Sequence, residues 1–206
     1  TLVVFLAILL GMLFVAGIDG KLLLKILGVG AACMPAFWFF LKDYQKSRLT
    51  VFLDPNVDPL GAGYHIIQSK IAIGSGQLFG KGLFAGSQSQ LNFLPENHTD
   101  FIFAVIGEEL GFVGSIVILA LYFLLLYRGV KTAQNARDKF GALLAAGITS
   151  MMAFHVMVNI GMTIGIMPVT GIPLPFMSYG VSALTTNLIS VGILLNIQSR
   201  QQKLMF

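Results

Sequence analysis

Three acidic side chains in one apolar stretch, LPENHTDFIFAVIGEELGFVG, are the first candidates for chemistry in this sequence. Asp100 stands at the start of the apolar run, and Glu108 and Glu109 lie inside it. A carboxylate at the end of a helix can take a proton from a hydroxyl group as a general base. It can equally be a first-turn acid that the helix macrodipole favours. We leave both alternatives open for Asp100 at this point.

The two glutamates need a different explanation, because ionisable side chains inside a membrane helix are costly and usually functional or paired. At about 100° per residue, Glu108 lies roughly 80° round the helix from Asp100 and Glu109 about 180°. One acceptor hydroxyl therefore cannot reach both Asp100 and Glu109. We predict that Glu108 and Glu109 are structural, as buried partners of polar groups or helix ends; the alternative is that they line a polar transport path.

A glycine-rich segment, GSGQLFGKGLFAGSQSQ, carries Lys81 and precedes the acidic stretch. Backbone N–H groups of such turns, together with a lysine, can cradle a phosphate group. The spacing is not that of a nucleotide-binding P-loop, and a plain flexible loop is the competing interpretation. The segment therefore makes Lys81 an anion-binding candidate without settling its role.

The composition identifies the class of protein that has to position these residues. The chain is 56% hydrophobic and 11% charged, whereas soluble domains carry about 25% charged residues. No charged residue occurs in the 60 positions from Phe140 to Ser199. These features predict an integral membrane protein and argue against nucleic-acid binding.

The single cysteine, Cys33, excludes an intrachain disulfide and a cysteine-based metal site.

We predict an all-α polytopic membrane protein that forms a single membrane domain over residues 1–206. A spanning helix needs about 20 mostly apolar residues, and Lys and Arg are enriched in cytoplasmic loops. The basic segments 128–139 and 199–206 then lie in the cytoplasm, and the long loop 42–99 lies outside. The five predicted transmembrane helices are residues 1–18, 21–41, 100–128, 140–165 and 176–198.

The long loop 42–99 is expected to be partly structured, because connections of this length are usually functional. Its first part, KDYQKSRLTVFLDPNVDP, has two Asp-Pro turns that favour irregular structure. Its second part, GYHIIQSKIAIG, has apolar residues at helical spacing and predicts a short helix at the membrane surface. Inside the spans, His155 is expected to be a hydrogen-bonded core residue. Polar groups such as Asn159 are expected to make hydrogen bonds between helices.

Three long motifs resemble the SEDS family, which comprises RodA, FtsW and the sporulation protein SpoVE. They are FLDPNVDPLGAGYHIIQSKIAIGSGQLFGKG, the acidic stretch above and PVTGIPLPFMSYG, and the likeness runs through essentially all 206 residues. The chain looks like the C-terminal half of a ten-helix member, and we favour the RodA branch. One departure is visible: Val181 follows Tyr179-Gly180, where the family commonly has a second glycine.

The resemblance implies a peptidoglycan glycosyltransferase that polymerises lipid II, with inversion, at the outer face of the bacterial plasma membrane. Asp100 matches the essential acid of the family and is expected to be the general base. A pyrophosphate leaving group needs cations, and a divalent cation such as Mg²⁺ could assist. The implied partners are lipid II, membrane lipid and a class B penicillin-binding protein. The residues expected to bind substrate are Arg48, Lys70, Lys81, His98 and Ser178.

Two other functions are compatible with the same residues. A lipid II flippase would use the buried acids to line a polar path. Broken helices and inverted repeats would favour it, and the sequence shows neither. A noncatalytic scaffold for the penicillin-binding protein would need none of the proposed chemistry. Polymerisation by purified protein without ATP or an ion gradient separates the enzyme from both.

Overall fold

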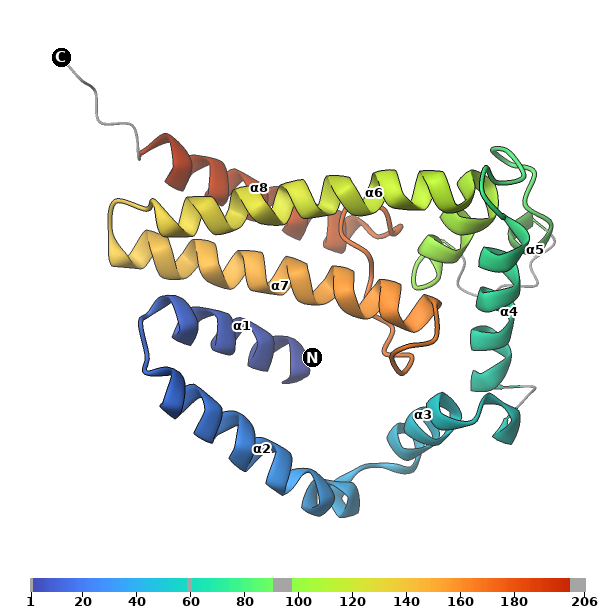
Figure 1. Ribbon diagram of the computed structural model, residues 1–206, viewed down its shortest axis with the longest axis horizontal. Coiled ribbons are helices and arrows are strands. Elements are labelled where there is room, and N and C mark those ends of the chain that lie inside the picture. Colours follow the sequence, from blue (N-terminus) through green and yellow to red (C-terminus); the bar gives the residue numbers. More distant parts are fainter. Residues whose placement is uncertain (1, 59–60, 91–97, 201–206) are drawn as a thin grey trace. The chain divides into compact units, whose positions relative to one another are not determined.

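The computed structural model describes residues 2–58, 61–90 and 98–200, and within these ranges every regular element is a helix (Figure 1). The predicted all-α class is therefore confirmed. The elements are α1 (Leu2–Val15), α2 (Gly20–Phe40), α3 (Asp43–Leu53), a 3₁₀ turn η1 (Pro55–Val57), α4 (Ala62–Ser75), α5 (Ser87–Gln90), α6 (Ile102–Gln134), α7 (Lys139–Thr163) and α8 (Val181–Ser199).

Three of these helices, α6, α7 and α8, are long and apolar enough to cross a membrane, among the residues that the structure describes. They correspond to the predicted spans 100–128, 140–165 and 176–198, so the chain is a polytopic membrane protein. Helices α1 and α2 occupy the other two predicted spans. That all five cross the membrane, with residues 42–99 outside, stays a prediction.

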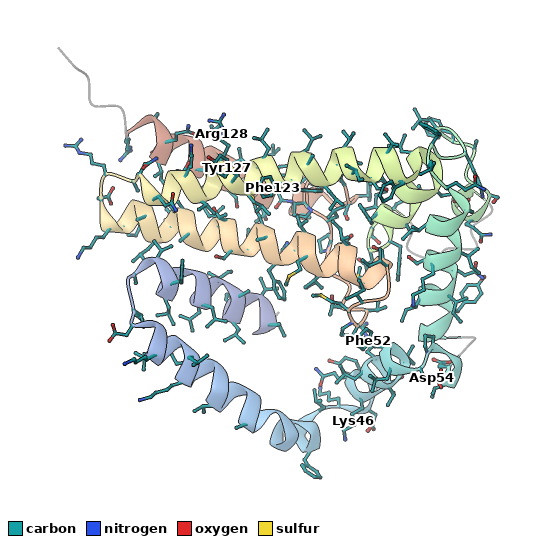
Figure 2. The ribbon with its side chains drawn as sticks, in the orientation of Figure 1. Lys46, Phe52, Asp54, Phe123, Tyr127 and Arg128 are labelled. Carbon is teal, nitrogen blue, oxygen red and sulfur yellow. The ribbon has the colours of Figure 1, made fainter. Side chains whose placement is uncertain are left out.

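Helix α6 continues six residues beyond the predicted end of its span. Within this extension Thr132 Oγ1 donates a hydrogen bond of 2.9 Å to the carbonyl of Arg128, and the Lys131 ammonium lies 4.9 Å from the centre of the Tyr127 ring. A basic residue in the last turn is also favoured by the helix macrodipole. Figure 2 shows Phe123, Tyr127 and Arg128 on the part of α6 that precedes this extension.

The segment 42–59 was expected to be irregular, and for most of its length this prediction is wrong. Residues Asp43–Leu53 form α3, which has an acidic residue in its first turn. The helix ends at Asp54, immediately before Pro55, because a residue that precedes proline disfavours the helical conformation. The Asp-Pro turn therefore ends a helix. The short helix predicted at GYHIIQSKIAIG is confirmed as α4, whose residues Ile66, Ser69 and Ala72 are fully or almost fully buried.

The chain divides into two compact units, and α6, α7 and α8 contribute residues to both. Unit 1 comprises Thr1–Phe40, Phe123–Phe154 and Thr185–Phe206, and unit 2 comprises Leu41–Tyr122 and His155–Leu184. The core of unit 1 is rich in alanine, as is common where membrane helices pack closely. One core cluster of unit 2 is built from larger side chains, and a second contains two alanines. The buried clusters are Ala133, Ala145, Ala146 and Leu194 in unit 1, and in unit 2 Phe103, Ile106, Tyr122, Val156 and Leu174, and Ala72, Phe101 and Ala104.

Candidate active site

The two adjacent glutamates lie next to a break in α6, so the expectation that no helix is broken is wrong. Gly111 has φ +67° and ψ −162°, so the helical hydrogen-bond pattern stops there. In a regular helix the carbonyls of Glu108 and Glu109 would accept from residues four positions later. Instead they accept from the backbone N–H groups of Lys81 and Gly82, both at 3.0 Å. A kink in a membrane helix is tolerated only where such groups find other partners.

The other half of the break is satisfied by the same glycine-rich segment. The N–H of Phe112 donates to the carbonyl of Gln77 at 2.9 Å, and the N–H of Val113 donates to that of Leu78 at 3.1 Å. The segment approaches so closely that a Cβ on Gly80 would overlap the Glu109 carbonyl. Residues 77–82 thus supply the hydrogen-bond partners that α6 lacks at its break. This close backbone packing accounts for the glycines of the segment, and a bound phosphate is not needed to explain them.

The Glu108 side chain is completely buried and its Oε1 atom collects several donors. The Lys81 ammonium lies 2.8 Å away, the backbone N–H of Gln88 donates at 2.9 Å, and Ser87 Oγ donates at 3.3 Å. Lys81 also donates to Ser87 Oγ at 2.8 Å, and its side chain is 29% exposed. Glu108 therefore ties the segment 81–88 to α6, as a structural residue would.

Glu109 differs from its neighbour. Its side chain is partly exposed, and no hydrogen bond or ion pair of its carboxylate is found within the described part of the chain. What Glu109 contributes to the kink is its main-chain carbonyl. The two adjacent acids are therefore distinct in their surroundings.

Asp100 lies just before α6 and is held by its main chain. The side chain of Asn159 on α7 is fully buried, and its Nδ2 atom donates to the carbonyls of Asp100, at 2.9 Å, and Ile172, at 2.8 Å. Asn159 thus joins the start of α6 to the loop between α7 and α8, residues 164–180. We call this loop the outer loop, after the side of the membrane that is proposed for it below. The Oδ1 atom of Asn159 is buried with no partner among the described residues.

Ser178 makes a second connection between the same two segments. Its Oγ donates to the carbonyl of Thr99 at 2.6 Å and accepts from the N–H of Leu174 at 2.7 Å. The N–H of Tyr179 donates to the carbonyl of His98 at 2.8 Å, and the His98 side chain is exposed. Because Ser178 is buried and engaged on both sides, its contacts are those of a positioning residue.

Several predicted site residues meet at the outer loop. The Asp100 carboxylate faces Gly171, where an added Cβ would be only 3.0 Å from Oδ2, and Lys70 packs against Gly165. Arg48 Nη1 donates to the carbonyl of Val169 at 3.2 Å. The structure therefore brings Arg48, Lys70, Asp100, His98 and Ser178 to one loop, whereas it brings Lys81 to Glu108.

The sequence did not single out Asn159 or His65 for this site. The sequence predicts Asn159 only as one of several residues that make hydrogen bonds between helices. The signal that could have singled it out is a polar amide within an otherwise apolar helix. His65 on α4 stacks on Phe101, with ring centres 5.9 Å apart and planes 11° apart. Nothing in the spacing of residues 65 and 101 indicates that contact.

A protein-only metal site is not formed by the described residues, because no three His, Cys, Asp or Glu side chains are grouped there. The donor set at the outer loop contains one carboxylate, Asp100. Mg²⁺ is usually bound by one or two carboxylates together with substrate phosphates and water. The described residues therefore do not make up a complete metal site by themselves.

Comparison with known proteins gives consistent matches along the chain. The family described as a cell cycle protein family, FtsW/RodA/SpoVE, matches residues 1–203. The peptidoglycan glycosyltransferase MrdB of Escherichia coli is 53% identical over 193 residues, which are 93% of this chain and 52% of MrdB. Stage V sporulation protein E of Bacillus subtilis is 53% identical over 154 residues, which are 75% of this chain and 42% of that protein.

Solved structures give the same result. A structure described as a peptidoglycan synthase complex that coordinates polymerization and crosslinking contains a chain with a TM-score of 0.78 and 35% identity. The match covers 98% of this chain and 56% of that chain. This chain thus spans about half the length of the relatives it matches. The predicted resemblance, including the RodA branch, is confirmed: the chain belongs to the FtsW/RodA/SpoVE family.

Proposed function

We propose that this chain is part of a peptidoglycan glycosyltransferase that polymerises lipid II at the outer face of the bacterial plasma membrane. The observation that carries the proposal is Asp100, a carboxylate just before α6 that faces the outer loop, which two cationic side chains, Arg48 and Lys70, also contact. The name of the Escherichia coli relative supports the reaction class. The activity belongs to the longer protein, of which this chain covers about half in its relatives.

In the proposed reaction Asp100 is the general base. An acceptor sugar hydroxyl attacks the anomeric carbon of the donor, and its proton passes to the Asp100 carboxylate. The bond from that carbon to the pyrophosphate oxygen breaks, and the electron pair leaves with the pyrophosphate. The α-linked donor thereby becomes a β-linked product in one inversion.

The leaving pyrophosphate is an anion, so cations near the outer loop would stabilise it. Arg48 and Lys70 are exposed and lie against this loop, at Val169 and Gly165. Lys81 would have to share its ammonium between the anion and Glu108. We therefore assign the pyrophosphate to Arg48 and Lys70 first, with Lys81 in a mainly structural role.

The remaining residues of the site have supporting roles in the proposal. Ser178 and Asn159 hold the outer loop against the start of α6 through the contacts described above. The exposed His98 imidazole contacts substrate or orients Asp100. A class B penicillin-binding protein is the proposed partner, because a structural relative is described as a complex that couples polymerization to crosslinking.

The proposed topology places the outer loop and residues 42–99 outside the cell, and the basic ends of α6 and α8 in the cytoplasm. The distribution of Lys and Arg supports this orientation. It would put Asp100 on the side where lipid II is used. All five of the predicted helices would then cross the membrane.

The proposal is tested with full-length protein purified in detergent and supplied with lipid II, without ATP or an ion gradient. Glycan polymer should form, and it should be lost when Asp100 is replaced by Asn. Transport of lipid II across vesicles without any polymer would instead support a flippase. Polymer formed only by an added synthase, with this protein enhancing it, would support a scaffold.

A further inference from the structure

A cavity in unit 1 has no role in the proposed reaction. It has a volume of about 430 Å³ and lies between the first turns of α7 and the C-terminal half of α8. Much of its wall is apolar, with Leu144, Ile189 and Ile193, and two arginines, Arg137 and Arg200, also line it. The cavity thus combines an apolar surface with two positive charges.

The two arginines are not neutralised by the described parts of the chain. No ion pair or hydrogen bond of either guanidinium is found there, and both residues are exposed. The acid among the lining residues is Asp138, whose Oδ2 accepts a hydrogen bond of 3.0 Å from the N–H of Gly141. This contact caps the start of α7. One capping carboxylate against two arginines leaves a net positive lining.

These properties define the chemistry of an occupant. A free phosphate ion would use the arginines and leave the apolar wall bare. A lipid with a neutral head group would cover the wall and gain little from the charges. We infer that the cavity binds one anionic phospholipid, with its phosphate at Arg137 and Arg200 and an acyl chain along Leu144, Ile189 and Ile193. Basic pockets between membrane helices commonly hold such head groups on the cytoplasmic side.

The test uses the full-length protein and measures phospholipid binding by native mass spectrometry during titration with dioleoylphosphatidylglycerol. The double variant Arg137→Gln/Arg200→Gln should bind this lipid about thirtyfold more weakly, the factor that corresponds to two charge contacts of about 1 kcal/mol each. The matched control is Arg128→Gln/Lys131→Gln, which removes two charges from the end of α6, outside the cavity lining. The control should bind like the wild type.

A second variant tests the apolar wall while keeping both charges. Gly192 lines the cavity, and a Cβ there would meet nothing within 4 Å, so Gly192→Leu should fold and fill the space. It should weaken binding by at least about tenfold, because a leucine side chain displaces the acyl chain from its contacts. Dioleoylphosphatidylcholine and glycerol phosphate, used as separate probes, should both bind weakly to the wild type.

The inference is overturned if both cavity variants bind phosphatidylglycerol like the wild type, which would mean that another part of the longer protein fills the cavity. It is also overturned if the control variant loses binding to the same extent, since general surface charge would then explain the affinity. Equal binding of glycerol phosphate would mean that the occupant is a small anion instead of a lipid.

Discussion

The ammonium of Lys81 and the fully buried carboxylate of Glu108 lie 2.8 Å apart, 27 positions apart in the sequence. This pair fixes the glycine-rich segment to α6 at the point where Gly111 interrupts the helix. Asp100 lies just before the same helix, on the outer-loop side of the break. In the proposed mechanism Asp100 takes part in the chemistry, whereas Glu108 and the main chain of Glu109 hold the structure together.

The adjacent acids Glu108 and Glu109 provide a matched pair of variants. Glu108→Gln removes the charge that faces Lys81 and should lower the free energy of unfolding by about 1–3 kcal/mol, because the ammonium then loses a charged partner. Glu109→Gln should change it by less than about 0.5 kcal/mol, since the role of Glu109 at the kink is that of its main chain. Thermal unfolding in detergent measures both. Equal effects of the two variants would refute the distinction.

Replacing Lys70 and replacing Lys81 should have opposite effects. Lys81→Met should lower thermal stability, because the Glu108 carboxylate is left buried without its cation. Lys70→Met should leave stability unchanged and reduce the polymerisation rate, because exposed Lys70 is assigned to the pyrophosphate. Unfolding temperature and polymer yield are measured on the same preparations. If Lys81→Met is stable but inactive, Lys81 takes part in the chemistry.

A glycine pair tests the contact between the segment 77–82 and α6. Gly80 has φ +79°, and a Cβ there would overlap the Glu109 carbonyl, so Gly80→Ala should cost roughly 1–3 kcal/mol of stability. Gly74 lies in α4, and a Cβ there would meet nothing within 4 Å. Gly74→Ala should therefore be neutral or stabilise the protein by about 0.5–1 kcal/mol. Denaturant or thermal unfolding distinguishes them, and a harmless Gly80→Ala would contradict the described packing.

Much of this arrangement follows from patterns in the sequence, and the rest depends on contacts between distant segments. Apolar runs predicted α6, α7 and α8 because the length of a spanning helix is set by the bilayer. The prediction that Glu108 is a buried partner of polar groups followed from the cost of a buried charge, and the structure shows it buried and paired. Its partner Lys81 could not be predicted, because the pairing depends on how residues 77–82 fold into the kink.

At the outer loop, too, local sequence patterns identified a candidate residue but not its contacts with distant segments. Asp100 could be singled out because a charged residue at the edge of an apolar run is locally visible. The sequence could not indicate that the side chain of Asn159, 59 positions later, donates a hydrogen bond to the Asp100 carbonyl. Nor could it indicate that the Ser178 hydroxyl donates to the carbonyl of Thr99. The helix α3 differs from the prediction because the Asp-Pro turn marks only its end and says nothing about the residues before it.

The buried amide of Asn159 should act through the position of Asp100. Asn159→Ala removes both hydrogen bonds to backbone carbonyls and should slow polymerisation by roughly tenfold, with a stability loss of about 1–3 kcal/mol. In an Asp100→Asn background the same substitution should reduce the residual rate little further, because the group it positions is already gone. Polymerisation rates of the two single variants and the double variant provide this comparison. Fully additive losses would show that Asn159 acts independently of Asp100.

The central claim, that Asp100 is the general base, is tested most directly by the polymerisation rate of full-length Asp100→Asn. Asparagine keeps the size of the side chain and its ability to cap a helix. The rate should therefore fall by about 10²-fold or more, with an unchanged unfolding temperature. Asp43→Asn, at an exposed acid in the first turn of α3, is the control and should polymerise normally. A near-normal rate for Asp100→Asn, in protein that is folded as the wild type is, would contradict the assignment.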